Sequence, residues 1–372
     1  MPKRILVWGA PATVNPKEPV LTSFERSGKN FGNLLIGNAV LSFLTENTII
    51  SRTELRSPEE ANERCDHVVI PAANFLWKDF DFGYMADFLE KTILPITIIG
   101  VGAQTNDRSI TSLIHPNTLR LMHLISERSA SLGVRGYYTA EVLAANGIHN
   151  VEVVGCPSLY TTRCPTVKVD ATRLSTLDNL SVNFSRRVYK HSFNPDRMRA
   201  IENILLKIAL TRNGTFVAQD ELEELSLSSG NDINTAPITD YFHDVDKNQV
   251  TRFFREQTRF FCDVGSWSSY IRAQSASIGS RFHGNLIALI NGIPALTIVH
   301  DSRTMEMCAL IGNPVVHVNQ VDDERLTEAS LMESLLSCSF ERFEQSYRVL
   351  YKRFVSFLNE NGLPHNLPVG QQ

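Results

Sequence analysis

The chain has 372 residues, of which 43% are hydrophobic and 20% are charged, and its formal net charge is −4. This length exceeds the usual size of one hydrophobic core, so we expect two domains. The slightly acidic balance argues against a nucleic-acid partner, although it leaves room for an isolated basic pocket.

Short aliphatic runs alternate with helical patterns through the first half, as in parallel βαβ units. The expected strands are residues 5–8, 67–71, 96–100 and 151–155, and the expected helices are 33–43, 83–92, 117–129 and 139–146. Residues 11–29 form a long loop, which could close over an acceptor substrate bound to the protein. A stretch rich in Thr, Arg, Pro and Asp, residues 160–178, is the expected linker.

The βαβ pattern restarts after the linker. Strands are expected at 180–185, 214–219, 276–279 and 295–299, and helices at 196–211 and 249–256, with a polar surface excursion at 226–239. Amphipathic residues 328–360 predict one or two closing helices. The predicted fold is α/β, with an N-terminal Rossmann-like domain (1–165), a C-terminal Rossmann-like domain (178–330) and closing helices with a tail (331–372). Two such domains form a cleft, and ligands of open α/β sheets bind beyond the carboxyl ends of strands.

The cysteine and hydropathy patterns indicate a cytoplasmic protein. Six scattered cysteines form no Cys-x-x-Cys pair and no His/Cys cluster at zinc spacing, which is typical of reduced, mostly buried thiols and predicts no metal site. The longest apolar candidate, Leu286 to Val299, is interrupted by Asn291, Gly292 and Pro294, so it falls short of the roughly 20 residues of a transmembrane helix.

The turn from Gly279 to Asn285 is the most informative segment, because it carries Arg281 and His283 where a strand ends and a helix begins. A helix N-terminus and an arginine fork favour an anion, and an imidazole beside it can move protons near neutral pH. The alternative is a structural ion pair for Arg281 and a helix-capping role for His283. The flanking glycines, Gly279 and Gly284, favour the functional interpretation because they permit close approach.

Arg186 and Arg187 follow the strand at 180–185 and could face Arg281 across a doubly charged anion. The alternative is a solvated basic turn. We expect one arginine to point inward and the other toward solvent.

Other candidates follow strand ends or open helices. Gly102 and Gln104 lie in a glycine-containing turn that lacks a full dinucleotide fingerprint, and the chain has no P-loop, so NAD and ATP receive little support. Tight packing is the alternative for this turn. Asn33 opens a helix, while Asp301 and Glu306 could either bind a substrate or cap the next helix.

Together these segments resemble the polysaccharide pyruvyl transferase family. The matching motifs are Asn-Phe-Gly-Asn (30 to 33), Gly-Val-Gly-Ala-Gln (100 to 104), Val-Arg-Gly-Tyr-Tyr-Thr-Ala-Glu-Val-Leu (134 to 143), Gly-Cys-Pro-Ser-Leu (155 to 159), Asp-Val-Gly-Ser-Trp (263 to 267), Gly-Ser-Arg-Phe-His-Gly-Asn (279 to 285), Gly-Ile-Pro (292 to 294) and His-Asp-Ser-Arg-Thr-Met-Glu (300 to 306). One departure is Ala72-Ala73-Asn74, where many members carry consecutive glycines.

The resemblance implies a GT-B-like fold and an enzyme that transfers pyruvate from phosphoenolpyruvate to two hydroxyls of a sugar, in a polysaccharide or its precursor, as a cyclic ketal. The implied donor side is the C-terminal domain and the acceptor side the N-terminal one. The implied catalytic residues are His283 and Arg281. The substrate-binding candidates are Arg186, Arg187, Ser280, Phe282, Gly284, Asn285, Asn33, Gly102, Gln104, Asp301 and Glu306.

Phosphoenolpyruvate suits these residues because its phosphate and carboxylate match arginines and a helix N-terminus. No metal or redox cofactor is required, although the sequence leaves open whether a divalent cation assists. It also leaves open the acceptor sugar, its attachment to lipid, nucleotide or free saccharide, and a homo-oligomeric state. An enzyme of this kind could work at the membrane surface where glycan precursors are assembled.

Two other functions are compatible with the sequence. One is a GT-B glycosyltransferase that uses a nucleotide sugar, with Glu306 on the ribose and Arg281 on the pyrophosphate. The other is a non-catalytic carbohydrate-binding or assembly protein. The presence of both Arg281 and His283 argues against this second function.

Overall fold

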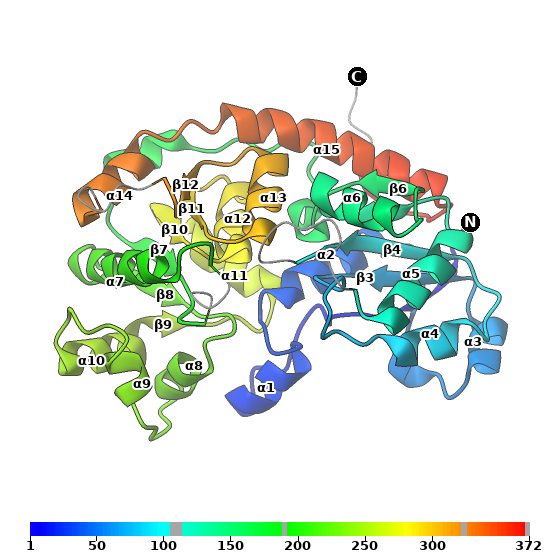
Figure 1. Ribbon diagram of the computed structural model, residues 1–372, viewed down its shortest axis with the longest axis horizontal. Helices are drawn as coiled ribbons and strands as arrows, with labels where there is room; N and C mark the ends of the chain where they lie inside the picture. Colours follow the sequence, from blue (N-terminus) through cyan, green and yellow to red (C-terminus); the bar gives the residue numbers. More distant parts are fainter. Residues whose placement is uncertain (105–113, 188–191, 321–325, 369–372) are drawn as a thin grey trace. The chain divides into compact units, whose positions relative to one another are not determined.

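The computed structural model describes residues 1–104, 114–187, 192–320 and 326–368. These residues form two compact units (Figure 1). Unit 1 comprises Met1–Ala10, Ile36–Thr166 and Ser346–Gln372, and unit 2 comprises Pro11–Leu35 and Val167–Gln345. The chain passes from unit 1 to unit 2 twice, between Ala10 and Pro11 and between Thr166 and Val167. The second passage lies inside the stretch expected to be the linker.

Unit 1 contains a six-stranded parallel sheet in the order β2-β1-β3-β4-β5-β6. Its strands are β1 (Arg4–Val7), β2 (Thr48–Ser51), β3 (His67–Pro71), β4 (Ile96–Val101), β5 (Leu132–Val134) and β6 (Val151–Val153). Its helices are most of α2 (Asn33–Phe43), α3 (Pro58–Arg64), α4 (Gly83–Leu89), α5 (Pro116–Glu127) and α6 (Tyr137–Ala145). Every residue of β3 and β4 is buried, as expected of central strands covered on both faces.

Unit 2 contains a second six-stranded parallel sheet, in the order β12-β11-β10-β7-β8-β9. Its strands are β7 (Leu180–Asn183), β8 (Thr215–Val217), β9 (Thr258–Arg259), β10 (Ala276–Gly279), β11 (Ala295–Val299) and β12 (Val315–His317). Its helices are α1 (Val20–Arg26), α7 (Pro195–Thr211), α8 (Leu222–Ser228), α9 (Ala236–Thr239), α10 (Lys247–Gln257), α11 (Val264–Arg272), α12 (Phe282–Ile290), α13 (Ser302–Ile311) and α14 (Glu328–Leu336).

Each sheet has a switch point, where the order of strands changes direction. In unit 1 this point lies between β1 and β3, because β2 pairs with the other edge of β1. In unit 2 it lies between β7 and β10, because β8 and β9 extend the sheet on one side and β11 and β12 on the other. Ligands of open α/β sheets bind beyond the carboxyl ends of strands at such points.

The predicted fold class is confirmed: the structure has two Rossmann-like βαβ units and C-terminal helices, the last being α15 (Glu341–Glu360), drawn in orange to red in Figure 1. Elements that the sequence did not predict are short, including β2, β9, β12, α3, α8 and α11. Strands of two to four residues leave too few positions for a hydrophobic period to be recognised.

Three stretches differ from their predicted state or place. The expected loop at 11–29 contains α1, whose Phe24 is buried against Phe31 with ring centroids 6.3 Å apart, and residues 11–35 belong to unit 2. The expected surface excursion at 226–239 contains the end of α8 and all of α9, with Ile238 buried. The second part of α15 belongs to unit 1, where the Tyr351 hydroxyl donates to the Arg163 carbonyl at 3.0 Å.

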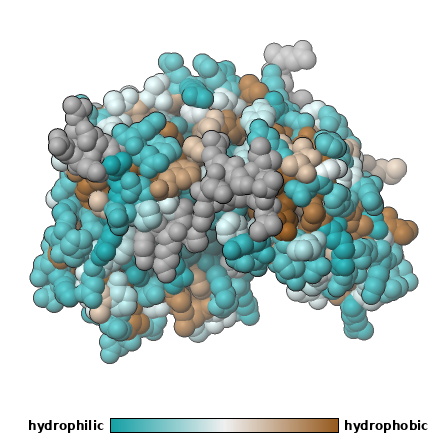
Figure 2. Space-filling view, in the orientation of Figure 1, coloured by the Kyte–Doolittle hydropathy of each residue, from teal (hydrophilic) through white to brown (hydrophobic). Residues whose placement is uncertain are grey.

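The cysteines are all free, but only Cys65, Cys156 and Cys308 are buried, so the expectation of mostly buried thiols holds for half of them. Within the described ranges, none of the helices combines the length and apolar character that a membrane crossing requires. Figure 2 shows a largely hydrophilic face on which apolar residues occur in small groups.

Candidate functional site

The switch point of unit 2 gathers residues from two distant parts of the sequence. Arg186 and Arg187 follow β7, and Arg281 and His283 follow its neighbour β10. Since parallel strands end at the same edge, the sheet brings both predicted anion-binding segments to one place, as the sequence predicted.

The turn after β10 is held by Asn183, the last residue of β7. Its Oδ1 accepts from the Arg281 backbone N–H at 3.0 Å, and its Nδ2 donates to Asn285 Oδ1 at 2.9 Å. A Cβ on Gly279, at φ +156°, would lie 1.7 Å from the Asn183 carbonyl oxygen, and one on Gly284 would lie 2.7 Å from Asn183 Cγ. Both positions therefore require glycine because Asn183 occupies the space that a side chain would fill. Asn285 belongs to the same internal hydrogen-bond network.

Arg281 lies beside two acidic residues, Asp220 and Glu221, in the segment after β8. Its Nη2 lies 2.9 Å from Asp220 Oδ2 and its Nε lies 3.6 Å from Glu221 Oε1, and the side chain is 7% exposed. Asp220 also accepts from Ser185 Oγ at 3.1 Å. Of the two interpretations left open for Arg281, the ion pair is the observed state.

His283 is half-buried in the first turn of α12, beside Phe282, at a ring separation of 5.7 Å. The backbone of Gly32 packs closely here, because a Cβ on that residue would lie 2.9 Å from His283 Nδ1 and 2.6 Å from Gln219 Oε1. The Asn-Phe-Gly-Asn segment thus lies against His283 within unit 2. Asn33 itself holds the preceding turn, since its Nδ2 donates to the Ser27 carbonyl at 3.1 Å.

Some buried polar atoms near this turn have no hydrogen-bond partner within the described ranges. They are Ser280 Oγ, Gln219 Nε2 and Glu221 Oε1, on residues that are 1%, 1% and 2% exposed, respectively. Leaving such atoms unsatisfied is costly, so native proteins usually pair them with a ligand or an ordered water. Two of the three can donate hydrogen bonds, which suits an anion.

The two arginines after β7 differ in exposure, and the expectation that one points inward is confirmed. Arg186 is 12% exposed and forms a bidentate pair with Glu224, at 2.5 Å from Nε and 3.1 Å from Nη2. Arg187 is 53% exposed, and its Nη2 lies 3.4 Å from Glu223 Oε2. The buried guanidinium is thus already occupied, and the accessible one is that of Arg187.

The acidic groups beneath these arginines have shifted pKa values. Burial raises the pKa of Glu202 to about 8, even though Tyr241, the Ser185 amide and two arginines oppose the shift. Burial also raises the pKa of Glu221 well above its usual value, and the neighbouring Asp220 carboxylate adds to the effect. Burial has the same tendency at Asp220, but the charge of Arg281 and hydrogen bonds outweigh it, so that pKa is lowered. The raised pKa values of Glu202 and Glu221 both favour the neutral carboxyl, which reduces the negative charge of the cluster.

Glu202 makes the stability of the protein depend on pH. Between its usual pKa of 4.5 and its folded-state pKa of about 8, the folded protein holds a proton that the unfolded chain has released. This stabilisation is complete below the unfolded-state pKa and falls by ~1.4 kcal/mol per pH unit as the pH rises toward the folded-state pKa. We expect Glu202→Gln to remove this slope, as measured by urea unfolding of both proteins between about pH 5 and pH 9. If the free energy of unfolding depended on pH in the same way in both proteins, the raised pKa of Glu202 would be contradicted.

Of the remaining predicted residues, Asp301 and Glu306 follow β11, the neighbour of β10 in unit 2, and the other two lie in unit 1. Asp301 caps α13, with Oδ1 accepting from the Thr304 N–H at 2.7 Å, so the capping alternative describes it, and Glu306 on the same helix is 8% exposed. Gly102 and Gln104 belong to unit 1. A Cβ on Gly102 would lie 2.9 Å from Arg135 Cδ, so the absence of a side chain here leaves room for the buried arginine.

Sequence reasoning missed Asn183, Glu202, Gln219, Asp220 and Glu221. A signal was available for the last three, because Gln219 ends the predicted strand at 214–219, Asp220 and Glu221 follow it, and all three share the sheet edge with Arg281. No comparable signal marks Glu202, which lies within an amphipathic helix.

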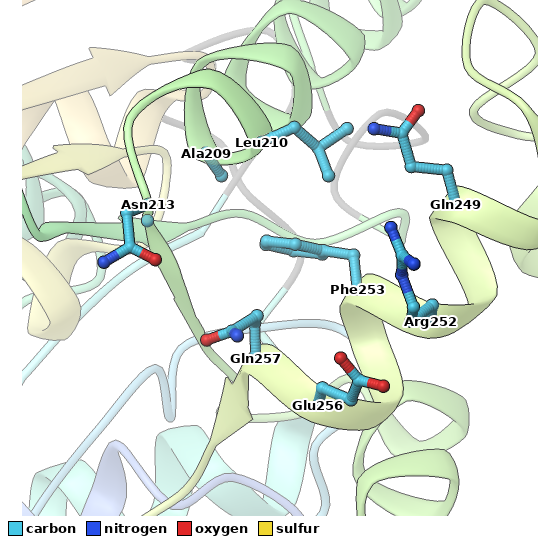
Figure 3. A pocket seen from close by; sticks show the side chains of 9 residues that line it. Ala209, Leu210, Asn213, Gln249, Arg252, Phe253, Glu256 and Gln257 are labelled. Atoms are coloured by element: carbon cyan, nitrogen blue, oxygen red, sulfur yellow. The ribbon is translucent and has the colours of Figure 1, made fainter.

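A cavity of about 210 Å³ lies between α7 and α10 (Figure 3). Gly214, which lines it, precedes β8, so the cavity lies toward the amino end of that strand rather than toward the edge with His283. No cluster of three or more His, Cys, Asp or Glu residues suited to a metal ion occurs in the described part of the chain.

Comparison with known proteins gives one family. The model of the polysaccharide pyruvyl transferase family matches residues 30–302. No curated protein matches the sequence.

Similar solved structures include the UDP-GlcNAc 2-epimerase of Neisseria meningitidis bound to UDP-GlcNAc, at 12% identity over 96% of this chain and 100% of that chain, with a TM-score of 0.48. The UDP-GlcNAc 2-epimerase of Methanocaldococcus jannaschii in complex with UDP-GlcNAc and UDP has 11% identity over 95% and 99% of the two chains and a TM-score of 0.45. An α,α-trehalose-phosphate synthase of Burkholderia vietnamiensis has 9% identity over 97% and 96%, with a TM-score of 0.40. Likeness of this degree carries no argument about function.

Proposed function

Since the chain belongs to the polysaccharide pyruvyl transferase family, we propose that it transfers pyruvate from phosphoenolpyruvate to two hydroxyls of a sugar, forming a cyclic ketal. The sugar is part of a polysaccharide or of its precursor. The donor site in this proposal is the switch point of unit 2, and the acceptor side is unit 1.

The observation that carries the proposal is the convergence of Arg281, His283 and Ser280 at that switch point, where Ser280 Oγ and Gln219 Nε2 are buried without hydrogen-bond partners among the described residues. An anion with several oxygen acceptors would satisfy these donors. Arg187 supplies an accessible positive charge on the neighbouring strand end. Asp220, which contacts Arg281 and Ser185, positions the Arg281 guanidinium.

In the proposed reaction, His283 in its protonated form donates a proton to the methylene carbon of phosphoenolpyruvate. Positive charge develops at C2, which one sugar hydroxyl attacks while losing its proton to the imidazole or to another base. The C2–O bond to phosphate then breaks, and the second hydroxyl attacks C2 and also loses its proton. The products are the ketal and inorganic phosphate, so two hydroxyl protons account for the new methyl C–H bond and for the proton on phosphate.

The charged groups around His283 have distinct roles in this reaction. Arg281 stabilises the charge that builds on the departing phosphate. To contact that phosphate fully, its guanidinium must share its N–H groups between the ligand and Asp220. Burial raises the pKa of Glu221, and a carboxyl that takes up a proton more readily repels the phosphate less, which favours this sharing.

Thermal unfolding with and without ligands tests the donor assignment. We expect phosphoenolpyruvate at 100 times its Kd to raise the free energy of unfolding by about 2.7 kcal/mol, and nucleotide sugars to leave it unchanged. Incubation with phosphoenolpyruvate and a panel of glycosides should then release phosphate and give a product of the mass of the pyruvate ketal. Protection by nucleotide sugars instead of phosphoenolpyruvate would contradict the proposal.

A further inference from the structure

We propose that four aromatic side chains at the switch point of unit 1 form a stacking surface for a neutral pyranose. These residues, Trp8, Tyr84, Phe82 and Phe75, are called the aromatic row below. The inference rests on the proposed function, because it assigns residues to the acceptor sugar, but its geometry lies entirely within unit 1.

The rings of the aromatic row follow one another at contact distances. The centroids of Trp8 and Tyr84 are 5.9 Å apart, those of Tyr84 and Phe82 are 6.2 Å apart, and those of Phe82 and Phe75 are 4.0 Å apart and stacked. Tyr84 is 59% exposed and the other three rings are half-buried. Each of the four residues therefore keeps part of its surface exposed, and Tyr84 keeps the most.

The position of the aromatic row is that of a ligand site rather than of a random exposed patch. Trp8 directly follows β1, and Phe75 comes shortly after β3, so both lie beyond the carboxyl ends of the two strands that flank the switch point. Ligands of open α/β sheets bind beyond the carboxyl ends of strands, and ligand sites are lined mainly by apolar and aromatic side chains.

The segment that carries Phe75 is fixed to its neighbours. Gly102 N–H donates to the Ala73 carbonyl at 2.9 Å, Leu76 N–H to the Gly102 carbonyl at 3.1 Å, and Gln104 N–H to the Leu76 carbonyl at 3.2 Å. Buried Arg135 reaches the same segment through Nη1, which donates to Asn74 Oδ1 at 2.8 Å. The Asn74 side chain thus links this segment to Arg135.

The other end of the aromatic row is anchored as well. The Trp8 ring packs edge-on against buried Phe88 at 5.3 Å, and the Arg52 guanidinium lies over both rings, at 5.1 Å from Trp8 and 3.9 Å from Phe88. A surface whose rings are held in place before binding loses little conformational entropy when a ligand arrives.

The chemistry of the surroundings favours a saccharide. The segment from Trp77 to Tyr84 has the sequence Trp-Lys-Asp-Phe-Asp-Phe-Gly-Tyr, so it carries two rings of the aromatic row and two exposed carboxylates, Asp79 and Asp81. Asp81 Oδ1 accepts from Asn117 Nδ2 at 3.0 Å, which orients that carboxylate beside Phe82. A pyranose presents C–H groups on a face, which stack on aromatic rings, and hydroxyls at its edge, which donate to carboxylates.

The test measures sugar binding directly, apart from turnover. Methyl glycosides of glucose, galactose, mannose and N-acetylglucosamine are titrated against the wild-type protein by saturation-transfer NMR and calorimetry. We expect at least one to bind, with the strongest saturation on the C–H protons of one pyranose face. Tyr84→Ala should weaken its binding about tenfold, which corresponds to ~1.4 kcal/mol. Tyr137→Ala is the matched control, because Tyr137 is 60% exposed on the same unit but lies outside the aromatic row.

The outcomes separate this inference from the proposed donor chemistry. Protection by phosphoenolpyruvate should be the same in Tyr84→Ala and in wild type. Equal loss of sugar binding in both tyrosine variants, or binding of none of the four glycosides by the wild type, would overturn the aromatic row as a saccharide site. Sugar binding that depends on Tyr84 without any effect of phosphoenolpyruvate would support the row while contradicting the donor assignment.

Discussion

Replacing His283 by alanine is expected to lower the rate of phosphate release from phosphoenolpyruvate by about 10²- to 10⁴-fold, because it removes the proposed proton donor to the methylene carbon. The fold should persist, since the imidazole is half-buried at the start of α12 rather than in the core. Phosphate release in the presence of an accepted glycoside, together with thermal unfolding of the same samples, measures both quantities.

His243→Ala provides the control for this variant. That histidine is 63% exposed in unit 2 and pairs with Asp244 at 3.3 Å, far in sequence from the turn after β10. It should retain wild-type activity. Near-normal turnover in His283→Ala would refute the proposed proton transfer, even if binding of phosphoenolpyruvate were confirmed.

Replacing Arg186 by alanine is expected to lower the free energy of unfolding by about 3–5 kcal/mol. The change leaves Glu224, which is 1% exposed, as a buried carboxylate without its bidentate partner, and it also removes the bond from Nη1 to the Pro237 carbonyl. Urea unfolding at neutral pH measures the loss. A change below about 1 kcal/mol would mean that the buried pair contributes as little as an exposed one.

Two further variants test whether the unpaired buried charge causes the expected loss of stability. Arg186→Met combined with Glu224→Leu should recover most of the lost stability, because no charge remains buried without a partner. Arg187→Ala should change stability by no more than about 0.5 kcal/mol, since its guanidinium is 53% exposed, yet it should raise the KM for phosphoenolpyruvate. An unchanged KM in that variant would remove Arg187 from the proposed donor site.

The partners of Arg281 could not have been predicted with the same ease as Arg281 itself. The turn from Gly279 to Asn285 is marked in the sequence by glycines between a short apolar strand and an apolar helix. Asp220 and Glu221 reach Arg281 only because β8 and β10 both lie beside β7 in one parallel sheet. The order of strands in a sheet depends on long-range pairing, which local patterns do not encode.

The glycines give a second example of the same limit. The sequence made Gly102 and Gly284 candidate ligand contacts, whereas the structure places Arg135 beside the first and Asn183 beside the second. A sequence shows that a side chain is missing, but it does not show what occupies the space. For both residues, contact with a substrate stays a prediction.

By itself the sequence determined the fold class, the central strands β3, β4, β10 and β11, and the placement of Arg281 and His283 at a strand end, because hydrophobic periods and glycine turns are local properties. The tertiary structure decided which charges Arg281 and Arg186 neutralise, that Arg187 is the accessible arginine, that residues 11–35 join unit 2, and that an aromatic row stands at the switch point of unit 1. These features arise where separate strands end at one sheet edge, so only the packing of the whole unit brings their side chains together.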